Sequence, residues 1–233
     1  MKRYSSEDVA LLKVEYANFA SALNDVKLED NIANFLLATK TIDIKENMML
    51  IGLASALKHE IGWRQVCEIY RYSLRFGDPT EGIYTTWLVC ALEILKKEEQ
   101  ESRCENGLQV IADTLRISND ALQHYPRHSG FAFLSGYFSY WCAKYYDPSP
   151  AQFENALSWF RQSAQWQQED KGEVDDDIKF YLGQSYLALH DWKTALAYYK
   201  SVDQKFLVSE HGEEGQEMLK ELQAGILLAE TKL

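Results

Sequence analysis

Two histidines are the first residues of this 233-residue chain whose type and spacing could do chemistry. His124 and His128 lie four positions apart, the spacing that places two metal ligands on one face of a helix. Pro126 stands between them and would break that helix, and no acidic or cysteine ligand is arranged with them in the sequence. We therefore interpret both as surface histidines that flank a turn, and we expect no metal site.

A run of three aspartates, Asp175, Asp176 and Asp177, is the second candidate, and its possible ligand is calcium. An EF-hand loop needs alternating ligands, a central glycine and a closing glutamate, and none of these follows the run. Directly after it, apolar residues recur at helical spacing from Ile178. We therefore predict that the aspartates cap a helix and form its acidic first turn, where carboxylates interact favourably with the positive end of the helix dipole.

The common signals of catalysis are missing from the sequence. No G-x-x-x-x-G-K-[ST], G-x-G-x-x-G, G-x-S-x-G or H-E-x-x-H motif occurs, which removes the commonest phosphate, dinucleotide, hydrolase and zinc-protease signals. The cysteines stand far apart without a C-x-x-C pair, and we predict that they are reduced and mostly buried; they are Cys67, Cys90, Cys104 and Cys142. We expect a protein that is not an enzyme and needs no cofactor.

Composition limits the partners and the compartment. The formal net charge is −11, from 24 basic and 35 acidic residues, and no Lys/Arg-rich stripe interrupts this balance. Because phosphate binding needs concentrated positive charge, we expect no nucleic-acid partner. No stretch approaches the roughly 18 apolar residues of a membrane span, and the N-terminus lacks the apolar region of a signal peptide. These features predict a cytoplasmic protein without membrane insertion.

The elements that must position these residues are helices. Hydrophobic residues make up 46% of the chain and recur at helical spacing, whereas its 12 glycines and 4 prolines fall mostly between the periodic segments. We therefore predict an all-α protein of about eleven helices. The clearest predicted helices cover residues 83–97, 107–126, 131–146, 152–167 and 211–233.

The stretch from Ile178 to Val208 carries the most specific pattern of the chain. It runs L-G-x-x-Y, then an aromatic residue, then A-x-x-x-F/Y, at residues Leu182, Gly183, Tyr186, Trp192, Ala195 and Tyr199. With these residues the stretch resembles a tetratricopeptide repeat (TPR). The small residues Gly183 and Ala195 allow two antiparallel helices to approach closely, while tyrosine and tryptophan side chains fill the volume beside that contact. Leu207 replaces the proline that follows the motif.

The resemblance implies a TPR-like α-solenoid of antiparallel helix pairs in one structural domain. Within its second repeat unit the register is open, because Trp87 fits either the Trp or the Leu position of the motif. We expect an atypical helix pair over residues 1–42 and a capping helix over residues 209–233. Between them we expect TPR-like repeats over residues 43–208, in units of about 43–79, 80–126, 127–173 and 174–208.

In TPR proteins the first helices of the pairs line a concave groove that meets an extended or helical peptide. Carrying the groove positions onto this chain predicts the peptide-binding residues Lys58, His59, Phe133, Tyr137, Tyr140, Phe180 and Gln184. Aromatic anchors suit such a pocket, but a Phe/Tyr stripe at helical spacing also suits a packed core, and both interpretations remain open. The set holds one lysine and no asparagine, unlike the carboxylate clamp of TPR domains that bind chaperone C-termini. We therefore expect a hydrophobic or basic partner segment.

The expected function follows from this resemblance. It is a non-enzymatic scaffold that binds a partner protein or peptide in its concave groove, as an adaptor, an assembly factor or a chaperone. The alternative is a structural subunit of a larger complex, held through its convex face or its C-terminal helix. The two hypotheses differ in the surface that the partner covers.

Overall fold

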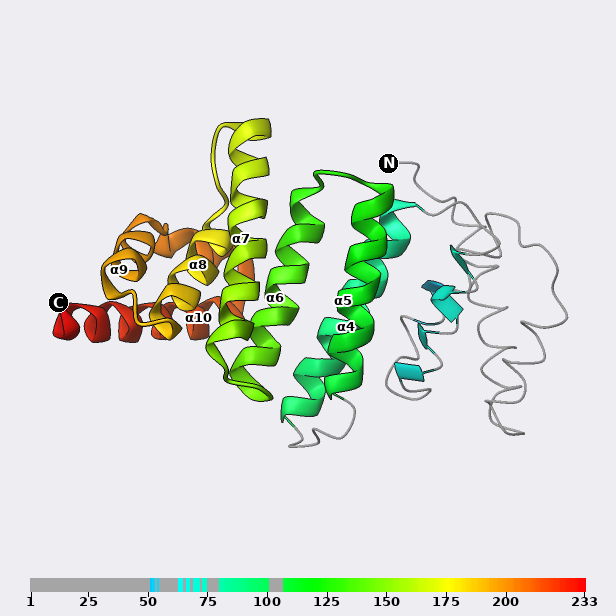
Figure 1. Ribbon diagram of the computed structural model, residues 1–233, viewed down its shortest axis with the longest axis horizontal. Helices are drawn as coiled ribbons and strands as arrows, with labels where there is room; N and C mark the ends of the chain where they lie inside the picture. Colours follow the sequence, from blue (N-terminus) through cyan, green and yellow to red (C-terminus); the bar gives the residue numbers. More distant parts are fainter. Residues whose placement is uncertain are drawn as a thin grey trace, which may run out of the picture. The chain divides into compact units, whose positions relative to one another are not determined.

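The structure is a computed structural model, and its described residues are helical wherever they form regular structure (Figure 1). It divides into two compact units, residues 1–106 and 107–233, which we describe separately. The predicted helix pair over 1–42 and the predicted site residues Lys58 and His59 lie outside the described residues. The structure describes residues 51–52, 54, 63–64, 66–67, 69–71, 73–74, 80–100 and 107–233.

The described core of the first unit is built around helix α4, Glu81–Gln100. Tyr70 stacks on Trp87 of α4, with ring centroids 5.2 Å apart and ring planes 8° apart. The Tyr70 hydroxyl lies 3.5 Å from Sγ of Cys90, one turn further along α4. Cys67 and Cys90 are both buried and free of disulfides, as predicted. Trp87 thus has an aromatic partner in the core. This packing is compatible with both the Trp position and the Leu position of the motif.

The second unit is a succession of helices in which each helix packs on the next (Figure 1). α5 and α6 agree with the sequence prediction to within two residues at each end. The prediction over 152–167 corresponds to a longer helix, α7, that Pro150 opens. The helices are α5 Gly107–His124, α6 Ser129–Tyr145, α7 Pro150–Lys171, α8 Asp176–Ala188, α9 Trp192–Ser201 and α10 Gln204–Lys232. No helix among the described residues is long and apolar enough to cross a membrane.

The boundaries of these helices follow from local chemistry. Asp175 stands at the N-cap position of α8 and two further aspartates form its first turn, as predicted, but the Asp175 carboxylate accepts a hydrogen bond from Gln167 and makes no capping hydrogen bond to α8. His128 is the N-cap of α6, and its Nδ1 accepts a hydrogen bond from the backbone N–H of Phe131 at 3.2 Å. Gly172 ends α7 with a φ of 80°, a left-handed conformation that favours glycine. These caps fix where each helix begins and ends.

The last helix differs from its prediction. Asp203 caps it, because its carboxylate accepts hydrogen bonds from the backbone N–H groups of Lys205 and Phe206 at 2.9 and 3.4 Å. α9 therefore ends at Ser201 and α10 begins at Gln204, whereas the sequence pattern placed the change at residue 209. Gly212, with φ 55° and ψ −121°, bends α10 after its second turn. The bend lets the remainder of α10 run in a different direction from its first two turns.

Two glycines allow close contacts in the core of the second unit. A Cβ on Gly136 of α6 would lie 2.7 Å from the Phe160 ring of α7. A Cβ on Gly183 of α8 would lie 2.5 Å from Cε1 of Tyr199 on α9. Both rings are fully buried. The sequence predicted a close approach of helices at Gly183 and Ala195 with tyrosines beside it, and the structure places Tyr199 directly against Gly183.

Candidate functional site

An aromatic cluster lies where α6, α7 and α8 meet. Its central residue is Tyr181, which is buried, and burial raises the pKa of its hydroxyl well above the usual range, so the hydroxyl stays protonated. The centroids of the neighbouring rings lie between 5.1 and 5.8 Å from that of Tyr181, and these rings belong to Phe133, Tyr137, Tyr140, Phe160 and Phe180.

The structure brings together the predicted groove residues that it describes. Phe133, Tyr137, Tyr140 and Phe180 all pack on Tyr181, and only Phe133 is more than marginally exposed to solvent. Their side chains therefore fill a core, the second of the two interpretations left open by the aromatic pattern. Their role in peptide binding stays a prediction.

Sequence reasoning missed Tyr181. The motif alignment assigned groove positions to its neighbours in α8 and none to Tyr181 itself. A signal was present: from Ile178 to Ala188, Lys179 carries the only formal charge. A helix with so little charge is buried on most of its faces.

A polar chain connects this cluster to the last helix. Tyr140 donates its hydroxyl proton to Oε1 of Gln184 at 3.4 Å, and Nε2 of Gln184 donates to Oε2 of Glu221 at 3.3 Å. Lys144 completes the chain, because its Nζ donates to Oε1 of Glu221 at 2.9 Å. Burial raises the pKa of Tyr140 above the usual tyrosine range, which keeps it a donor. Glu221 of α10 thus joins α6 and α8.

α10 also contacts its neighbours at two other points. Near its bend, Nε2 of His211 lies 2.9 Å from Oδ1 of Asp177 on α8. Near its end, Glu230 pairs with Lys200 of α9 at 3.0 Å. Figure 1 shows α10 passing behind α8 and continuing below α9 toward the C-terminus. The chain's own C-terminal helix therefore lies beside the predicted groove residues Tyr140 and Gln184.

Exchange of Asp177 for asparagine tests how burial acts on this carboxyl group. Burial raises the pKa of Asp177 above its ordinary value of 3.8, and the charge and hydrogen bond of His211 oppose the rise. A carboxyl group with a raised folded-state pKa binds protons more readily in the folded chain, so this contribution favours the folded state at low pH. This contribution to stability is lost as the pH rises from 3.8 through the raised pKa of Asp177 in the folded chain.

We therefore expect the free energy of unfolding of the wild type, relative to Asp177→Asn, to fall as the pH rises across this window. Because one group binds at most one proton, this fall in relative stability is at most about 1.4 kcal/mol per pH unit. Urea unfolding of both proteins at several pH values measures it. A relative stability of the wild type that instead grows with pH would contradict the assignment.

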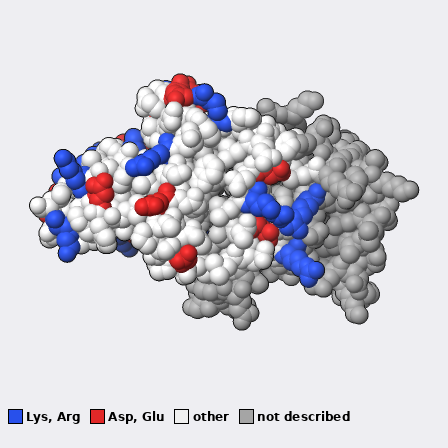
Figure 2. All heavy atoms as spheres, in the orientation of Figure 1, with Lys and Arg blue, Asp and Glu red and all other residues white. Residues whose placement is uncertain are grey.

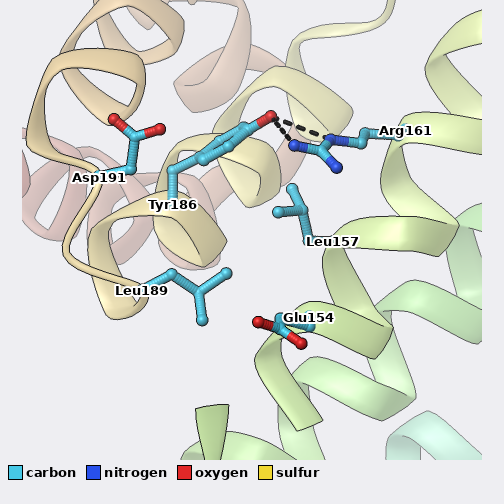
Figure 3. Close-up of a pocket in the computed structure, with 6 residues that line it drawn as sticks. All are labelled: Glu154, Leu157, Arg161, Tyr186, Leu189 and Asp191. Atoms are coloured by element: carbon cyan, nitrogen blue, oxygen red, sulfur yellow. Dashed lines mark hydrogen bonds between the residues drawn. The ribbon is translucent and has the colours of Figure 1, made fainter. Parts of the chain in front are cut away.

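A cleft lies on another part of the second unit, between α7 and the turn from α8 to α9 (Figure 3). Its volume is about 430 Å³. Arg161 is held at one end, because its Nε and Nη2 donate hydrogen bonds to the Tyr186 hydroxyl at 3.0 and 2.5 Å. The lining residues are Glu154, Leu157, Arg161, Tyr186, Leu189 and Asp191.

The walls of the cleft combine apolar and acidic groups with one basic group, the guanidinium of Arg161. Leu157 and Leu189 present aliphatic side chains, and Figure 3 shows the carboxylates of Glu154 and Asp191 on different sides of them. Oδ1 of Asp191 accepts a hydrogen bond from the backbone N–H of Thr194 at 3.2 Å. Glu154 is exposed and, within the described residues, makes no ion pair. The part of the cleft around Glu154, away from Arg161, therefore suits a cationic group on an aliphatic stem.

The sequence offered no direct signal for this cleft. Arg161 and Tyr186 are 25 residues apart and meet only because α7 packs on α8. Tyr186 was identified only as a motif residue, and the structure places its ring on that of Tyr198, with centroids 5.6 Å apart. Burial raises the pKa of Tyr198, so that ring remains a neutral phenol.

The two histidines considered for metal binding have local partners. Nδ1 of His124 lies 3.0 Å from the carbonyl oxygen of Asp120, within the same helix. His128 caps α6 and its ring stacks on Phe131. Among the residues that the structure describes, no group of three or more His, Cys, Asp or Glu side chains is placed to hold a metal ion. On the face drawn in Figure 2, basic and acidic side chains of the described residues are interspersed.

The described part of the chain is thus all-helical, with a filled aromatic cluster and an open cleft lined by two leucines, two carboxylates, Tyr186 and Arg161. No protein-family model matches the sequence, and no curated protein is significantly similar to it. The functional interpretation therefore depends on the geometry above and on the motif residues of the sequence.

Proposed function

We propose that this chain is a cytoplasmic, TPR-like α-solenoid that acts as a non-enzymatic scaffold and binds a partner protein, as an adaptor, an assembly factor or a chaperone. The motif contact between Gly183 and Tyr199 supports the repeat, as does the packing of each helix from α5 to α10 on the next. The observation that carries the binding proposal is the cleft between α7 and the α8–α9 turn.

The cleft is favoured over the predicted groove as the place where a partner binds first. Tyr140 and Gln184 are buried and already bonded within the chain, through Glu221 of α10. A peptide would have to displace those contacts before it could reach them. The cleft, by contrast, is open to solvent and holds an exposed carboxylate, that of Glu154.

The end of the cleft at Glu154, away from the cation of Arg161, favours a lysine or arginine side chain of the partner. The methylene groups of such a side chain would contact Leu157 and Leu189, and its cation would pair with Glu154. Asp191 adds a second negative charge nearby. The formal net charge of −11 favours the approach of a basic partner to the whole chain. The proposed partner therefore presents a basic side chain flanked by apolar residues.

Charge reversal in the cleft tests this function. We expect Glu154→Lys to weaken binding of the partner by about 10- to 100-fold, because a repulsive charge replaces an attractive one in a partly desolvated site. The partner is first captured from the source cells on immobilised wild-type protein and identified by mass spectrometry. Its dissociation constant for each variant is then measured by titration calorimetry.

Asp170→Lys is the matched control. Asp170 is also exposed and also on α7, and at 16 residues from Glu154 it lies about 24 Å along the helix. We expect this variant to bind within about twofold of the wild type. Capture of no partner at all, or equal binding by both lysine variants, would exclude the cleft as the binding site.

A further inference from the structure

α10 consists of two helical segments that fold back on each other at Gly212. Gly212 has φ 55° and ψ −121°, the conformation of the first central residue of a type II′ turn, which glycine adopts far more readily than other residues. A Cβ on Gly215, in the second segment, would overlap the carbonyl oxygen of Leu207, in the first. In a straight helix these two residues would be about 12 Å apart. The bend therefore brings the two backbones into contact.

The second segment, residues 213–232 and here called the arm, is bonded to three other helices. Glu221 of the arm accepts hydrogen bonds from Lys144 of α6 at 2.9 Å and from Gln184 of α8 at 3.3 Å. Glu230 of the arm pairs with Lys200 of α9 at 3.0 Å. Each of these contacts joins a residue after Gly212 to a residue before α10.

The surface under the arm fits the sequence of the arm closely. A Cβ on Gly225 would lie 2.6 Å from the buried ring of Tyr199, so this place has room for glycine alone. Glu221, with the polar contacts just described, stands four residues earlier, which is one helical turn. Met218 and Leu222 are buried on the same side of the arm. The surface thus accepts a helix with a carboxylate one turn before a glycine, and the arm has this pattern.

We propose that the arm also docks on a second copy of this chain, so that two copies exchange their arms. Exchange needs a change at one residue, because helical dihedral angles at Gly212 would make α10 a single straight helix and carry the arm away from its own unit. All contacts of the arm then form again on the second copy. The complementarity of shape and charge seen within one chain selects this occupant.

The contact at the bend is compatible with a two-fold axis. Leu207 and Gly215 are equally far from position 211 in the sequence. Two straight α10 helices that cross antiparallel at this position would therefore place Leu207 of each copy on Gly215 of the other copy. Gly212 and Gly215 are three residues apart and adjoin on one face of a straight helix, which permits a close approach of the two backbones. Such a dimer is closed, since both copies use the same surface.

Gly212→Ala tests the hinge in the full chain. Alanine disfavours the bent conformation and favours a helix, and an added Cβ would meet nothing within 4 Å. The bent monomer is strained at one hinge, and two hinges are released in each dimer. At about tenfold for each hinge, we expect the dimer association constant to rise about 100-fold over that of the wild type. Sedimentation equilibrium over a wide range of protein concentration measures this constant.

Gly172→Ala is the matched control for the hinge. Gly172 also has a positive φ, of 80°, and an added Cβ would again meet nothing within 4 Å, but this glycine ends α7 and is not joined to the arm. We expect Gly172→Ala to dimerise no more than the wild type. Gly212→Ala/Glu154→Lys should dimerise like Gly212→Ala, because no residue of the arm lines the cleft. Failure of arm exchange and failure of the proposed function are therefore distinguishable.

Reversed charges distinguish exchanged arms from two copies that merely lie side by side. One protein combines Gly212→Ala with Lys144→Glu, and a second, isotopically labelled protein combines Gly212→Ala with Glu221→Lys. Each exchanged homodimer opposes like charges at both contacts, whereas the exchanged heterodimer opposes unlike charges at both. After the two proteins are refolded together from urea, native mass spectrometry should find more heterodimer than random mixing produces.

The wild type provides a measurement that does not depend on how the variants fold. Refolding from urea at high protein concentration should convert part of it into a dimer, because arms then meet second copies before their own surface closes. Three results would overturn the proposal. They are equal dimerisation of the Gly212→Ala and Gly172→Ala proteins, random mixing of the two charge variants, and refolded wild type that contains no dimer.

Discussion

Replacement of Tyr181 by alanine is expected to lower the free energy of unfolding of the second unit by about 3–5 kcal/mol, the range for removing a large buried aromatic side chain. Tyr181 is the common neighbour of rings from three helices, including Phe133 of α6, Phe160 of α7 and Phe180 of α8. Its loss removes the contacts of all of them at once and leaves a cavity that these helices cannot close without moving.

Chemical denaturation followed by circular dichroism measures this effect. Leu227→Ala serves as the control, because Leu227 is 67% exposed and should change the stability by no more than about 0.5 kcal/mol. Tyr181→Phe keeps the ring and should retain most of the stability, which separates packing from the hydroxyl group. A Tyr181→Ala protein as stable as the Leu227→Ala protein would show that the aromatic cluster does not hold the three helices together.

Replacement of Gly183 by alanine is expected to destabilise the chain by about 1–3 kcal/mol, the usual cost of overpacking. The added methyl carbon would lie 2.5 Å from Cε1 of Tyr199. That ring is fully buried and cannot retreat, because Gly225 of α10 closes on its other side at a corresponding distance of 2.6 Å. The clash outweighs the gain of up to about 1 kcal/mol that alanine brings over glycine inside a helix.

Gly82→Ala is the matched control for this prediction. Gly82 lies in α4, and the nearest atom to an added Cβ is Oγ1 of Thr80 at 3.9 Å, so the substitution should not destabilise the chain. Combining Gly183→Ala with Tyr199→Leu makes room for the methyl group, and the two changes should couple by about 0.5–3 kcal/mol in a double-mutant cycle. Equal stability of the Gly183→Ala and Gly82→Ala proteins would show that the close contact between Gly183 and Tyr199 does not limit the residue at position 183.

Local patterns predicted most of the described helices. α5 was predicted over 107–126 and covers Gly107–His124, and the acidic run was correctly placed at the N-cap position and first turn of α8, although Asp175 makes no capping hydrogen bond. Such features depend on residues within one or two turns of each other, so the sequence is sufficient. The start of α10 was predicted too late, because the cap at Asp203 depends on two hydrogen bonds that apolar periodicity does not report.

The candidate sites were less predictable. The motif assigned Tyr137, Tyr140 and Phe180 to a peptide-binding groove, and the pattern left open whether they are exposed or packed in a core. In the structure the rings of all three residues pack on the buried ring of Tyr181, so they belong to a core. The cleft was not predicted, because it forms only where Glu154 and Leu157 of α7 come near Leu189, more than thirty residues further along the chain.

By itself the sequence determined the helical class, the absence of common catalytic motifs and the close approach of two helices at Gly183, because periodicity, motif residues and side-chain size are local properties. Only the tertiary structure decided that α10 reaches Gln184 through Glu221, and that an open cleft lies beside Arg161. Both depend on the angles at which helices pack and on the bend at Gly212. Those angles arise from contacts between residues far apart in the chain, which no single stretch of sequence contains.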